Sequence, residues 1–461
     1  MSVIKLVKEK KIFEEIEVKT HTDVAEEIMN DFRFATLSDT KEILLYQDGR
    51  YTDEAEILIE EECEKRIPNC MSHQVNEITK TIQRSTYVKR GSFDQYPYLI
   101  NLKNGILNIV KGTFRQHTPN ILFRVQIPVT YDPKIGPENF IKFLIECLPD
   151  YKDRITVFEE MASILLPGLK LEKAYLHEGE GSNGKSTLFS IIAAIGGHEN
   201  TSHISIHDLI NHRFARSGLD GKILNTYSEI SNDEITHPGI LKALISGDPV
   251  SVEKKGRDAF TLNNYARFFF SANDLPEINN FKFAELRRFI VTKWNQKFVD
   301  DPSEEDLRNG IKKTDIMLKG ELTSEQELSG ILNLLFFHAK KLLKNKKFTY
   351  EQSAEQLEIE WKLKTDHVEV FANTHLIKNP DEKTPKSLVY ESYKQWCQKN
   401  KLTSKSEREF NSRIKKNFED TRVKIAGKTT VVWNGMEIDQ SKVTQCAELL
   451  PLQSEKQKVK N

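Results

Sequence analysis

Residues 179–187, with the sequence GEGSNGKST, have the types and spacing needed to hold the phosphate chain of a nucleotide. They match the pattern GxxxxGK followed by Ser or Thr, and they lie between an expected strand at 174–177 and an expected helix at 188–195. Glycines in such a turn let successive backbone N–H groups face phosphate oxygens at the helix N-terminus. Lys185 would place its charge at the β- and γ-phosphates, and the Ser186 hydroxyl would bind Mg²⁺. The residues predicted to bind ATP are Gly179, Gly181, Ser182, Asn183, Gly184, Lys185, Ser186 and Thr187.

Two polar residues follow short apolar runs further along the chain. Glu229 ends the run 222–228, and an acid at the carboxyl end of a buried strand lies where α/β sheets bind ligands. It is predicted to position water and Mg²⁺ beyond the γ-phosphate, the alternative being a surface glutamate on an ordinary strand. Asn273 ends the run 266–272, and its amide would bond both a γ-phosphate and the attacking water.

Arg287 and Arg288 stand just before the apolar run 289–291. One of them could act as an arginine finger that reaches the γ-phosphate of a neighbouring subunit. For an arbitrary Arg-Arg pair, a solvated helix end is the more ordinary interpretation.

These residues require an α/β scaffold to position them. Helical spacing at 138–166 is followed, up to residue 298, by short apolar runs that alternate with helical segments, and 301–345 is expected to be helical again. Before this region, strands are expected at Phe34–Leu37 and Ile43–Tyr46, a helix at Ala55–Arg66 and a hairpin at Asn104-Gly105. The pattern predicts a small α+β domain ahead of an α/β core.

The C-terminal region is locally basic. Residues 376–432 contain 14 Lys and Arg against 7 Asp and Glu, a net charge of +7. Helices are expected at 386–399 and 404–417 and a hairpin at 423–433, an order similar to a winged helix. DNA contact is predicted, the alternatives being a solvated basic face or a protein-docking module. The candidate contacts are Arg408, Arg413, Lys415 and Lys416 near the second helix, and Lys424 and Lys428 on the wing.

Composition limits the class of protein. The 461 residues are 38 % hydrophobic and 29 % charged, with a net charge of only −1, so a nucleic-acid surface must come from local charge. The five cysteines lack CxxC spacing, which disfavours zinc and redox motifs and indicates a reducing cytoplasm. No signal peptide or membrane span is expected.

The order of these motifs resembles superfamily-3 helicases, most closely the helicase module of phage and plasmid primases and poxvirus-type helicase-primases. The order is GxxNxGKS, a strand ending in Glu, ISGDPVSVEKKGRDAF, FFFSANDLPEI and then Arg-Arg. YLINLKNGILNI with IPVTYDP resembles the small domain before that ATPase, and ELSGILNLLF resembles its following helical segment. The resemblance runs through most of the chain.

The resemblance implies roles for particular residues. Lys185 and Ser186 would form the Walker A site, with Asn183 as the extra loop Asn. Glu229 would be the Walker B acid and share the metal with Ser186, and Asn273 would be the sensor. Arg288, rather than Arg287, would be the finger. Viral members often have two adjacent acids where Ser228 precedes Glu229 here, so the group that holds Mg²⁺ through water stays open.

The resemblance also implies a DNA-contacting hairpin at residues 250–262. Its tip would carry Lys254, Lys255 and Arg257 into a ring channel and contact single-stranded DNA phosphates without reading bases. The alternative is a solvated basic turn.

Together these features predict an α/β chain with a P-loop ATPase core of the AAA+-like superfamily-3 type. The expected divisions are an α+β domain at 1–135, the ATPase at 136–345, a winged helix at 346–440 that contacts duplex DNA, and a disordered tail at 441–461. The expected function is an ATP-dependent, hexameric DNA helicase for plasmid, phage or mobile-element replication. With about 135 residues ahead of the ATPase, primer synthesis is expected from a separate primase or polymerase. The alternatives are an ATPase that remodels or loads proteins at an origin, or an ATP-switched origin-binding protein.

Overall fold

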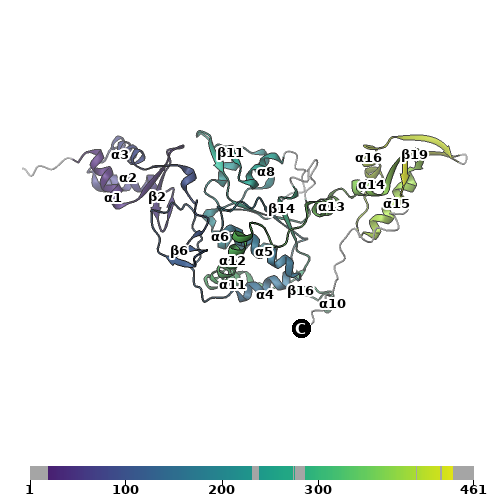
Figure 1. The fold of residues 1–461 in the computed structure, drawn as a ribbon, viewed down its shortest axis with the longest axis horizontal. Coiled ribbons are helices and arrows are strands. Elements are labelled where there is room, and N and C mark those ends of the chain that lie inside the picture. The colour runs from purple at the N-terminus through teal and green to yellow at the C-terminus, as the bar shows by residue number, and fades with distance from the viewer. Residues whose placement is uncertain are drawn as a thin grey trace, which may run out of the picture. The chain divides into compact units, whose positions relative to one another are not determined.

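The computed structural model divides the chain into two compact units (Figure 1). Unit 1 takes the described residues up to Glu229 together with 239–271 and 291–350, and unit 2 takes the others. None of the described helices is long and apolar enough to cross a lipid bilayer. The structure describes residues 19–230, 238–273, 275, 286–400, 402–425 and 428–439, so the predicted tail at 441–461 lies outside the described residues.

Unit 1 begins with a small sheet backed by three helices. The strand order is β3-β2-β1-β4, with β1 antiparallel to β2 and parallel to β4. Ile28, Ile59 and Ile78, one from each helix, are fully buried in the core beneath this sheet. The expected strands and helix at residues 34–66 are therefore confirmed. The elements are α1 (His21–Asp31), β1 (Phe34–Leu37), β2 (Ile43–Gln47), β3 (Arg50–Thr52), α2 (Ala55–Arg66), α3 (Ser72–Ser85), β4 (Tyr87–Val88) and η1 (Arg90–Ser92).

A three-stranded meander follows, formed by β5 (Leu99–Leu102), β6 (Gly105–Asn108) and β7 (Thr113–Arg115). The hairpin expected at Asn104-Gly105 is confirmed, because Leu102 pairs with Gly105 across a two-residue loop. Gly105 has φ +155°, and a Cβ there would lie 2.6 Å from the Arg115 carbonyl oxygen.

The centre of unit 1 is a five-stranded sheet in the order β14-β8-β13-β10-β9. Strand β10 runs parallel to both β13 and β9. Every residue of β8 and β13 is buried, as their apolar sequences predict for strands covered on both faces. The strands are β8 (Ala174–Glu178), β9 (Thr201–Ser202), β10 (Leu224–Tyr227), β13 (Arg267–Ala272) and β14 (Phe289–Lys293).

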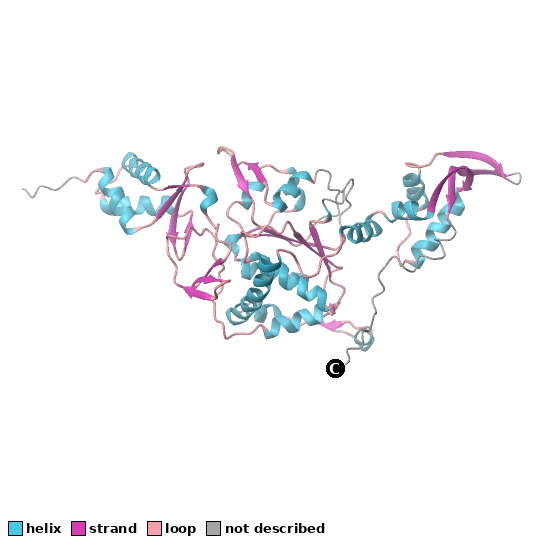
Figure 2. Cartoon of the chain, viewed as in Figure 1, coloured by secondary structure: helices cyan, strands magenta, loops and turns pink. Residues whose placement is uncertain are grey.

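Helices flank this sheet, as the cyan ribbons around the magenta strands in Figure 2 show. The two long helices α5 and α12 pack against each other. The helices are α4 (Glu138–Cys147), α5 (Tyr151–Ile164), α6 (Lys185–Gly196), η2 (His198–Asn200), α7 (Ile206–Asn211), η3 (Ala215–Leu219), α8 (Gly239–Ser246) and α12 (Glu325–Asn345).

The expectation of continuous helix at 301–345 is wrong in its first half. Only α10 (Glu304–Arg308) and α11 (Leu318–Leu322) are helical there, and Gly310 between them has φ +81°. The chain instead forms β16 (Lys312–Lys313), which pairs in parallel with β15 (Phe298–Val299). A glycine in the left-handed region ends a helix, and the local apolar spacing does not reveal it.

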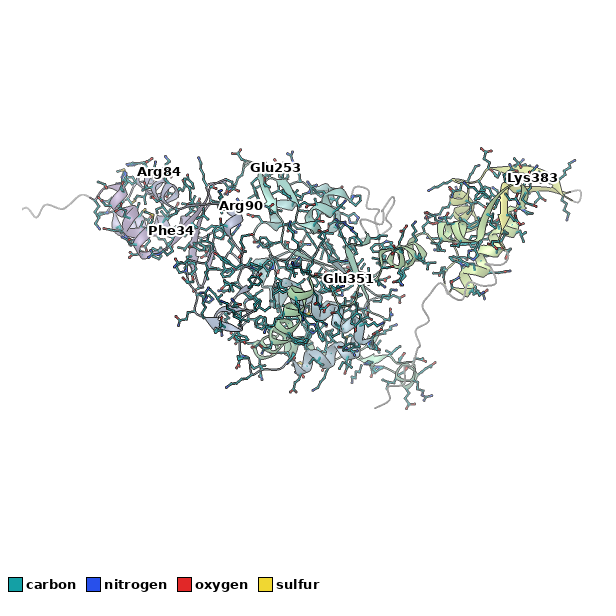
Figure 3. All side chains as sticks on the ribbon, viewed as in Figure 1. Phe34, Arg84, Arg90, Glu253, Glu351 and Lys383 are labelled. Atoms are coloured by element: carbon teal, nitrogen blue, oxygen red, sulfur yellow. The ribbon has the colours of Figure 1, made fainter. Side chains whose placement is uncertain are left out.

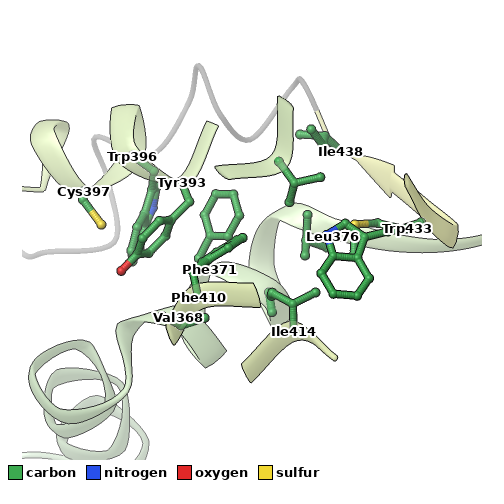
Figure 4. Packing of buried hydrophobic residues seen from close by; sticks show 13 residues of the cluster. Val368, Phe371, Leu376, Tyr393, Trp396, Cys397, Phe410, Ile414, Trp433 and Ile438 are labelled. Carbon is green, nitrogen blue, oxygen red and sulfur yellow. The ribbon is translucent and has the colours of Figure 1, made fainter. Parts of the chain in front are cut away.

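The described C-terminal part of unit 2 has a three-stranded sheet in the order β17-β19-β18 and four helices. Its core is aromatic: Phe371, Tyr393, Phe410 and Trp433 are fully buried (Figure 4). The elements are α13 (Ala354–Thr365), α14 (His367–His375), β17 (Leu376–Pro385), α15 (Lys386–Lys399), α16 (Glu407–Ile414), β18 (Asp420–Ile425) and β19 (Lys428–Ile438).

Local sequence predicts most of this region. The helix at 386–399 is confirmed, and the expected hairpin forms between β18 and β19 with a longer second strand. The helix expected at 404–417 is shorter, because Ser406 caps its N-terminus and the helix ends at Ile414.

Candidate nucleotide-binding and nucleic-acid-binding sites

At two positions of the loop between β8 and α6, Gly179 and Gly184, a side chain would collide with neighbouring atoms. Gly184 is the N-cap of α6 and has φ +94°, which is costly for residues with a Cβ. A Cβ there would lie 2.5 Å from the Cys147 sulfur and 3.2 Å from the Phe143 ring. At Gly179 a Cβ would lie 2.4 Å from the Trp294 carbonyl oxygen. Strand, tight turn and helix N-terminus therefore follow one another as the sequence predicts for a phosphate-binding turn.

Lys185 is held inside the loop that it follows. The side chain is only 6 % exposed, and burial lowers the pKa of its ammonium group from the ordinary value. Its Nζ donates to the carbonyl oxygen of Gly179 and to Oδ1 of Asn183, the latter at 3.3 Å. The ammonium group is thus positioned over the turn before any ligand binds.

Edge strand β14 and the residues after it fasten the loop to the sheet. The Trp294 backbone N–H donates to the Glu178 carbonyl at 2.7 Å, and the Trp294 carbonyl accepts from Nδ2 of Asn183 at 3.1 Å. Further on, the Phe298 N–H donates to the Ser182 carbonyl at 2.8 Å. Asn183, predicted as the extra loop Asn, therefore links the turn to the end of β14.

Beneath the loop lies a buried polar group that is absent from the predicted site residues. Nε1 of Trp294 donates to Nδ1 of His177 at 3.0 Å, and Nε2 of His177 lies 3.5 Å from a carboxyl oxygen of Glu160. Burial lowers the pKa of His177 to about 3 and raises the pKa of Glu160 to about 8. At neutral pH both side chains are uncharged, so His177 is a neutral hydrogen-bonding residue in the loop's foundation. In the sequence His177 stands out as a titratable residue in the apolar run 174–177, whereas Glu160 gives no such signal because α5 contains four other charged residues.

Glu229 and Asn273 each follow a strand of the central sheet. Glu229 comes two residues after the end of β10 and is exposed, and Asn273 comes directly after β13 and is exposed. In the strand order β13 lies between β8 and β10, and β10 runs parallel to β13. Parallel strands end at the same edge of a sheet, which is where α/β proteins bind ligands.

The two arginines before β14 differ in exposure. Arg288 is 5 % exposed, whereas Arg287 is exposed. A residue that acts on a neighbouring subunit must be accessible, so accessibility favours Arg287 over Arg288, the reverse of the order that the resemblance implies.

The predicted hairpin is present as β11 (Pro249–Val252) and β12 (Phe260–Asn263), with Gly256 at φ +76° in the turn. Two of its tip cations already have a partner, because Nζ of Lys254 lies 3.5 Å and Nη1 of Arg257 4.0 Å from Oε1 of Glu42. Lys255 is exposed at the turn.

The C-terminal cations also fall into two groups. Arg413 forms an ion pair with Asp366 at 2.6 Å and a second with Glu409 at 3.6 Å, so it helps to hold α16 against the start of α14. Lys415 pairs with Asp420 at 3.3 Å. Lys415 is nevertheless exposed, as are the other candidate contacts Arg408, Lys416, Lys424 and Lys428.

Three family models match separate parts of the chain. Residues 7–149 match a D5 N-terminal-like family, residues 177–288 match a family of unknown function, and residues 363–447 match a poxvirus D5 protein-like family.

Several curated relatives are viral proteins. The chain is 22 % identical over 332 residues to "Putative helicase 121R" of Invertebrate iridescent virus 3, covering 66 % of this chain and 35 % of the relative. It is 21 % identical to "Putative helicase L207/L206" of Acanthamoeba polyphaga mimivirus, covering 67 % and 34 %. It is 22 % identical to "Putative primase C962R" of African swine fever virus, covering 48 % and 24 %. The chain thus spans a quarter to about a third of these relatives.

Among solved structures, the apo C-terminal region of NrS-1 is similar with a TM-score of 0.44 and 15 % identity, over 91 % of this chain and all of that one. A similarity this distant carries no argument about function. D5 models match both the N-terminal and the C-terminal regions of the chain, and the relatives above are named as viral helicases and primases, so these matches support a relationship to the poxvirus D5-like helicase-primase family.

Proposed function

We propose that this protein is an ATP-dependent, ring-forming DNA helicase of the superfamily-3 type that works in replication of a plasmid, phage or other mobile element. The observation that carries the proposal is the turn at residues 179–186, in which a left-handed Gly184 and a buried Lys185 are fastened to the end of β14. A turn of this geometry between a strand and a helix N-terminus suits the phosphates of a nucleotide.

The residues present fit ATP and Mg²⁺. A Cβ at Gly179 or Gly184 would collide with neighbouring atoms, which is expected of a cradle whose backbone must curl tightly. In this proposal Lys185 exchanges its loop acceptors for phosphate oxygens, and the exposed Ser186 hydroxyl holds Mg²⁺. When bound, Mg²⁺ neutralises charge on the phosphates.

The chain's other residues would then act on the far side of the nucleotide. Glu229 accepts a hydrogen bond from the attacking water and orients it, and Asn273 bonds the γ-phosphate. An arginine from the segment before β14 of a neighbouring subunit stabilises the transferring charge. Arg287 is the stronger candidate because it is accessible, whereas Arg288 is buried.

DNA contact is assigned to two basic turns. Lys254, Lys255 and Arg257 at the β11–β12 tip would follow the phosphates of one strand without reading bases. In unit 2, the order α14, β17, α15, α16, β18, β19 is that of a winged helix, with α16 and the β18–β19 turn as its duplex-contacting parts. A hexamer, with a separate primase or polymerase, completes the proposal.

Strand displacement and ATP hydrolysis measured together test the proposal. Lys185→Ala is expected to lose both, because it removes the charge from the phosphates. Lys255→Ala, at an exposed turn, is expected to lower strand displacement much more than hydrolysis. Lys111→Ala, another exposed lysine, is the matched control and is expected to change neither.

Two results would contradict the proposal in different ways. If Lys185→Ala hydrolyses ATP at the wild-type rate, the nucleotide site is wrong. If hydrolysis is normal in the wild type but insensitive to single-stranded DNA and no strand is displaced, the protein is better explained as an ATPase that remodels other proteins.

A further inference from the structure

A second site for nucleic acid is suggested by a cleft of about 520 Å³ between the small N-terminal sheet and the central sheet of unit 1. One wall contains residues 89–95, and the other contains residues 167–171 and the second hairpin strand with the residues after it. Arg90, labelled in Figure 3, lies in this wall between the two sheets. The volume is in the range of sites that hold small or extended ligands.

Both acidic side chains that line the cleft are paired with arginines in salt bridges. Nε of Arg90 bonds to Asp39 at 2.8 Å, and its Nη1 bonds to Asp220 at 2.6 Å. Asp220 also accepts from Arg124 at 3.4 Å, so two carboxylates are shared between two guanidinium groups. These pairs join the N-terminal sheet to the segment before β10 and leave the cleft without a surplus of negative charge.

Three further cations line the cleft. Lys89 and Lys170 are exposed, and within the described residues neither has a carboxylate at ion-pair distance. Arg267 is 6 % exposed and donates to the carbonyls of Ser163, Leu166 and Leu169, so dipoles rather than a carboxylate balance its charge. With five cations against two acids, the lining has a net charge of +3 in a chain whose total is −1.

The shape and the charge together favour a phosphate backbone as the ligand. Walls of low dielectric constant focus the field of a cation excess into a cleft. Lysines at its exposed positions act as point charges that suit phosphates in any orientation, whereas planar base recognition needs fixed forks or stacked aromatic rings.

The cleft is continuous with the hairpin. Thr261, Leu262 and Asn263 of β12 belong to the cleft wall, and the same strand leads back to the turn that carries Lys255 and Arg257. Four residues of strand span about 13 Å, so the hairpin turn and the cleft wall are separated by only a short length of strand. A strand held at the tip could therefore extend into the cleft.

We infer that this cleft is a second binding site for single-stranded DNA, in which Lys89 and Lys170 contact the backbone of the strand that the hairpin tip holds. The inference rests on the proposed function. If the cleft binds DNA, the N-terminal sheet forms part of the DNA-binding surface and contributes to the affinity for single-stranded DNA.

The test is binding of a fluorescein-labelled oligothymidylate to the full chain, followed by fluorescence anisotropy over a series of salt concentrations. The Lys89→Ala, Lys170→Ala double variant is expected to weaken binding on the order of 10-fold and to lower the slope of log affinity against log salt by about 1.4, roughly 0.7 per lost phosphate contact. The Lys111→Ala, Lys344→Ala double variant removes the same charge from exposed positions outside the cleft and is expected to bind like the wild type.

The outcomes separate this inference from the proposed function. If the cleft variant binds like its control while Lys255→Ala binds poorly, the cleft inference is overturned and the helicase proposal stands. If the wild type shows no affinity for the oligonucleotide, both are overturned. A fluorescent ATP analogue serves as a second probe: loss of its binding without loss of oligonucleotide binding would assign the cleft to a mononucleotide and overturn the inference.

Discussion

The phosphate loop and the hairpin tip carry positive charge in opposite ways. Lys185 is 6 % exposed and donates to two acceptors within its own loop, in a turn that tolerates no Cβ at Gly184. Lys255 lies exposed in a turn where Gly256 has open space around it. The first arrangement depends on fixed geometry and the second on summed charge. A single substitution in the loop should therefore abolish nucleotide binding. Each substitution of a cation at the hairpin tip should instead weaken DNA binding by part of its total.

The substitution with the largest expected effect is Gly184→Ala in the phosphate loop. A Cβ costs about 1–2 kcal/mol in the left-handed region, and overpacking against Cys147 and Phe143 costs about 1–3 kcal/mol more. We expect the free energy of unfolding to fall by about 2–5 kcal/mol and ATP hydrolysis to be lost. Chemical denaturation and a phosphate-release assay measure the two effects.

The matched control is Gly181→Ala. Gly181 also has a positive φ, of +64°, but a Cβ at this position would have no neighbouring atom within 4 Å. The substitution is expected to cost only the backbone contribution of about 1–2 kcal/mol. Equal losses in the two variants would show that space around Gly184 is unimportant and would weaken the contrast between the two regions.

Local sequence pattern is sufficient to predict the elements that hold this loop. Short apolar runs predict the strand before it, the helix after it and the strands leading to Glu229 and Asn273, and β8, α6, β10 and β13 confirm them. Their hydrophobic and turn signals lie within a few residues of one another. The roles of the site residues themselves stay predictions.

Contacts between distant segments cannot be predicted in this way. The Asn183 bond to Trp294, the Lys254 pair with Glu42 and the Arg413 pair with Asp366 each join residues that lie far apart in the sequence. The spacing of residues along the chain does not reveal partners of this kind. The local charge pattern therefore predicts DNA contact for Arg413, although Arg413 forms two ion pairs within unit 2.

Strand β17 escapes prediction for a different reason. Pro380 and Pro385 within this stretch indicate an interruption, because proline cannot donate to a sheet. In the structure β17 is an edge strand, with Pro380 inside the irregularity between Lys378 and Lys383 and Pro385 as the last strand residue. These are the positions where a sheet tolerates proline, but only the completed sheet identifies β17 as an edge.

The second prediction concerns the pH dependence of the loop's foundation. Glu160 has its pKa raised to about 8 by burial, so between pH 4.5 and 8 the unfolded chain releases a proton that the folded chain keeps. Stability from this group therefore falls as pH rises through that window. His177, with its pKa lowered to about 3, has the opposite effect between pH 3 and 6.5, because the unfolded chain binds the proton. The two effects cancel between pH 4.5 and 6.5, and the loss remains from pH 6.5 to 8.

Glu160→Gln should remove that alkaline loss. At about 1.36 kcal/mol per pH unit, the wild type should lose roughly 2 kcal/mol relative to Glu160→Gln between pH 6.5 and 8. Glu146→Gln, at an exposed position of α4, controls for the general loss of a carboxylate. Parallel pH profiles for all three proteins in urea denaturation would show that the buried carboxyl does not govern this window.

The smallest expected effect is at the hairpin tip, where Glu42→Gln removes the carboxylate that Lys254 and Arg257 face. The two pairs share one carboxylate oxygen at the long distances of 3.5 and 4.0 Å, so together they are worth about 1 kcal/mol or less, and releasing the two cations should tighten oligothymidylate binding by at most about 5-fold. Glu60→Gln, an exposed acid of α2, removes the same charge at a distance from any hairpin contact. A gain in affinity for Glu42→Gln over Glu60→Gln would mean that the N-terminal sheet competes with DNA for the tip. Equal affinities would mean that DNA binding at the tip depends only on total charge. The hairpin tip would then differ most clearly from the phosphate loop, whose function depends on fixed geometry.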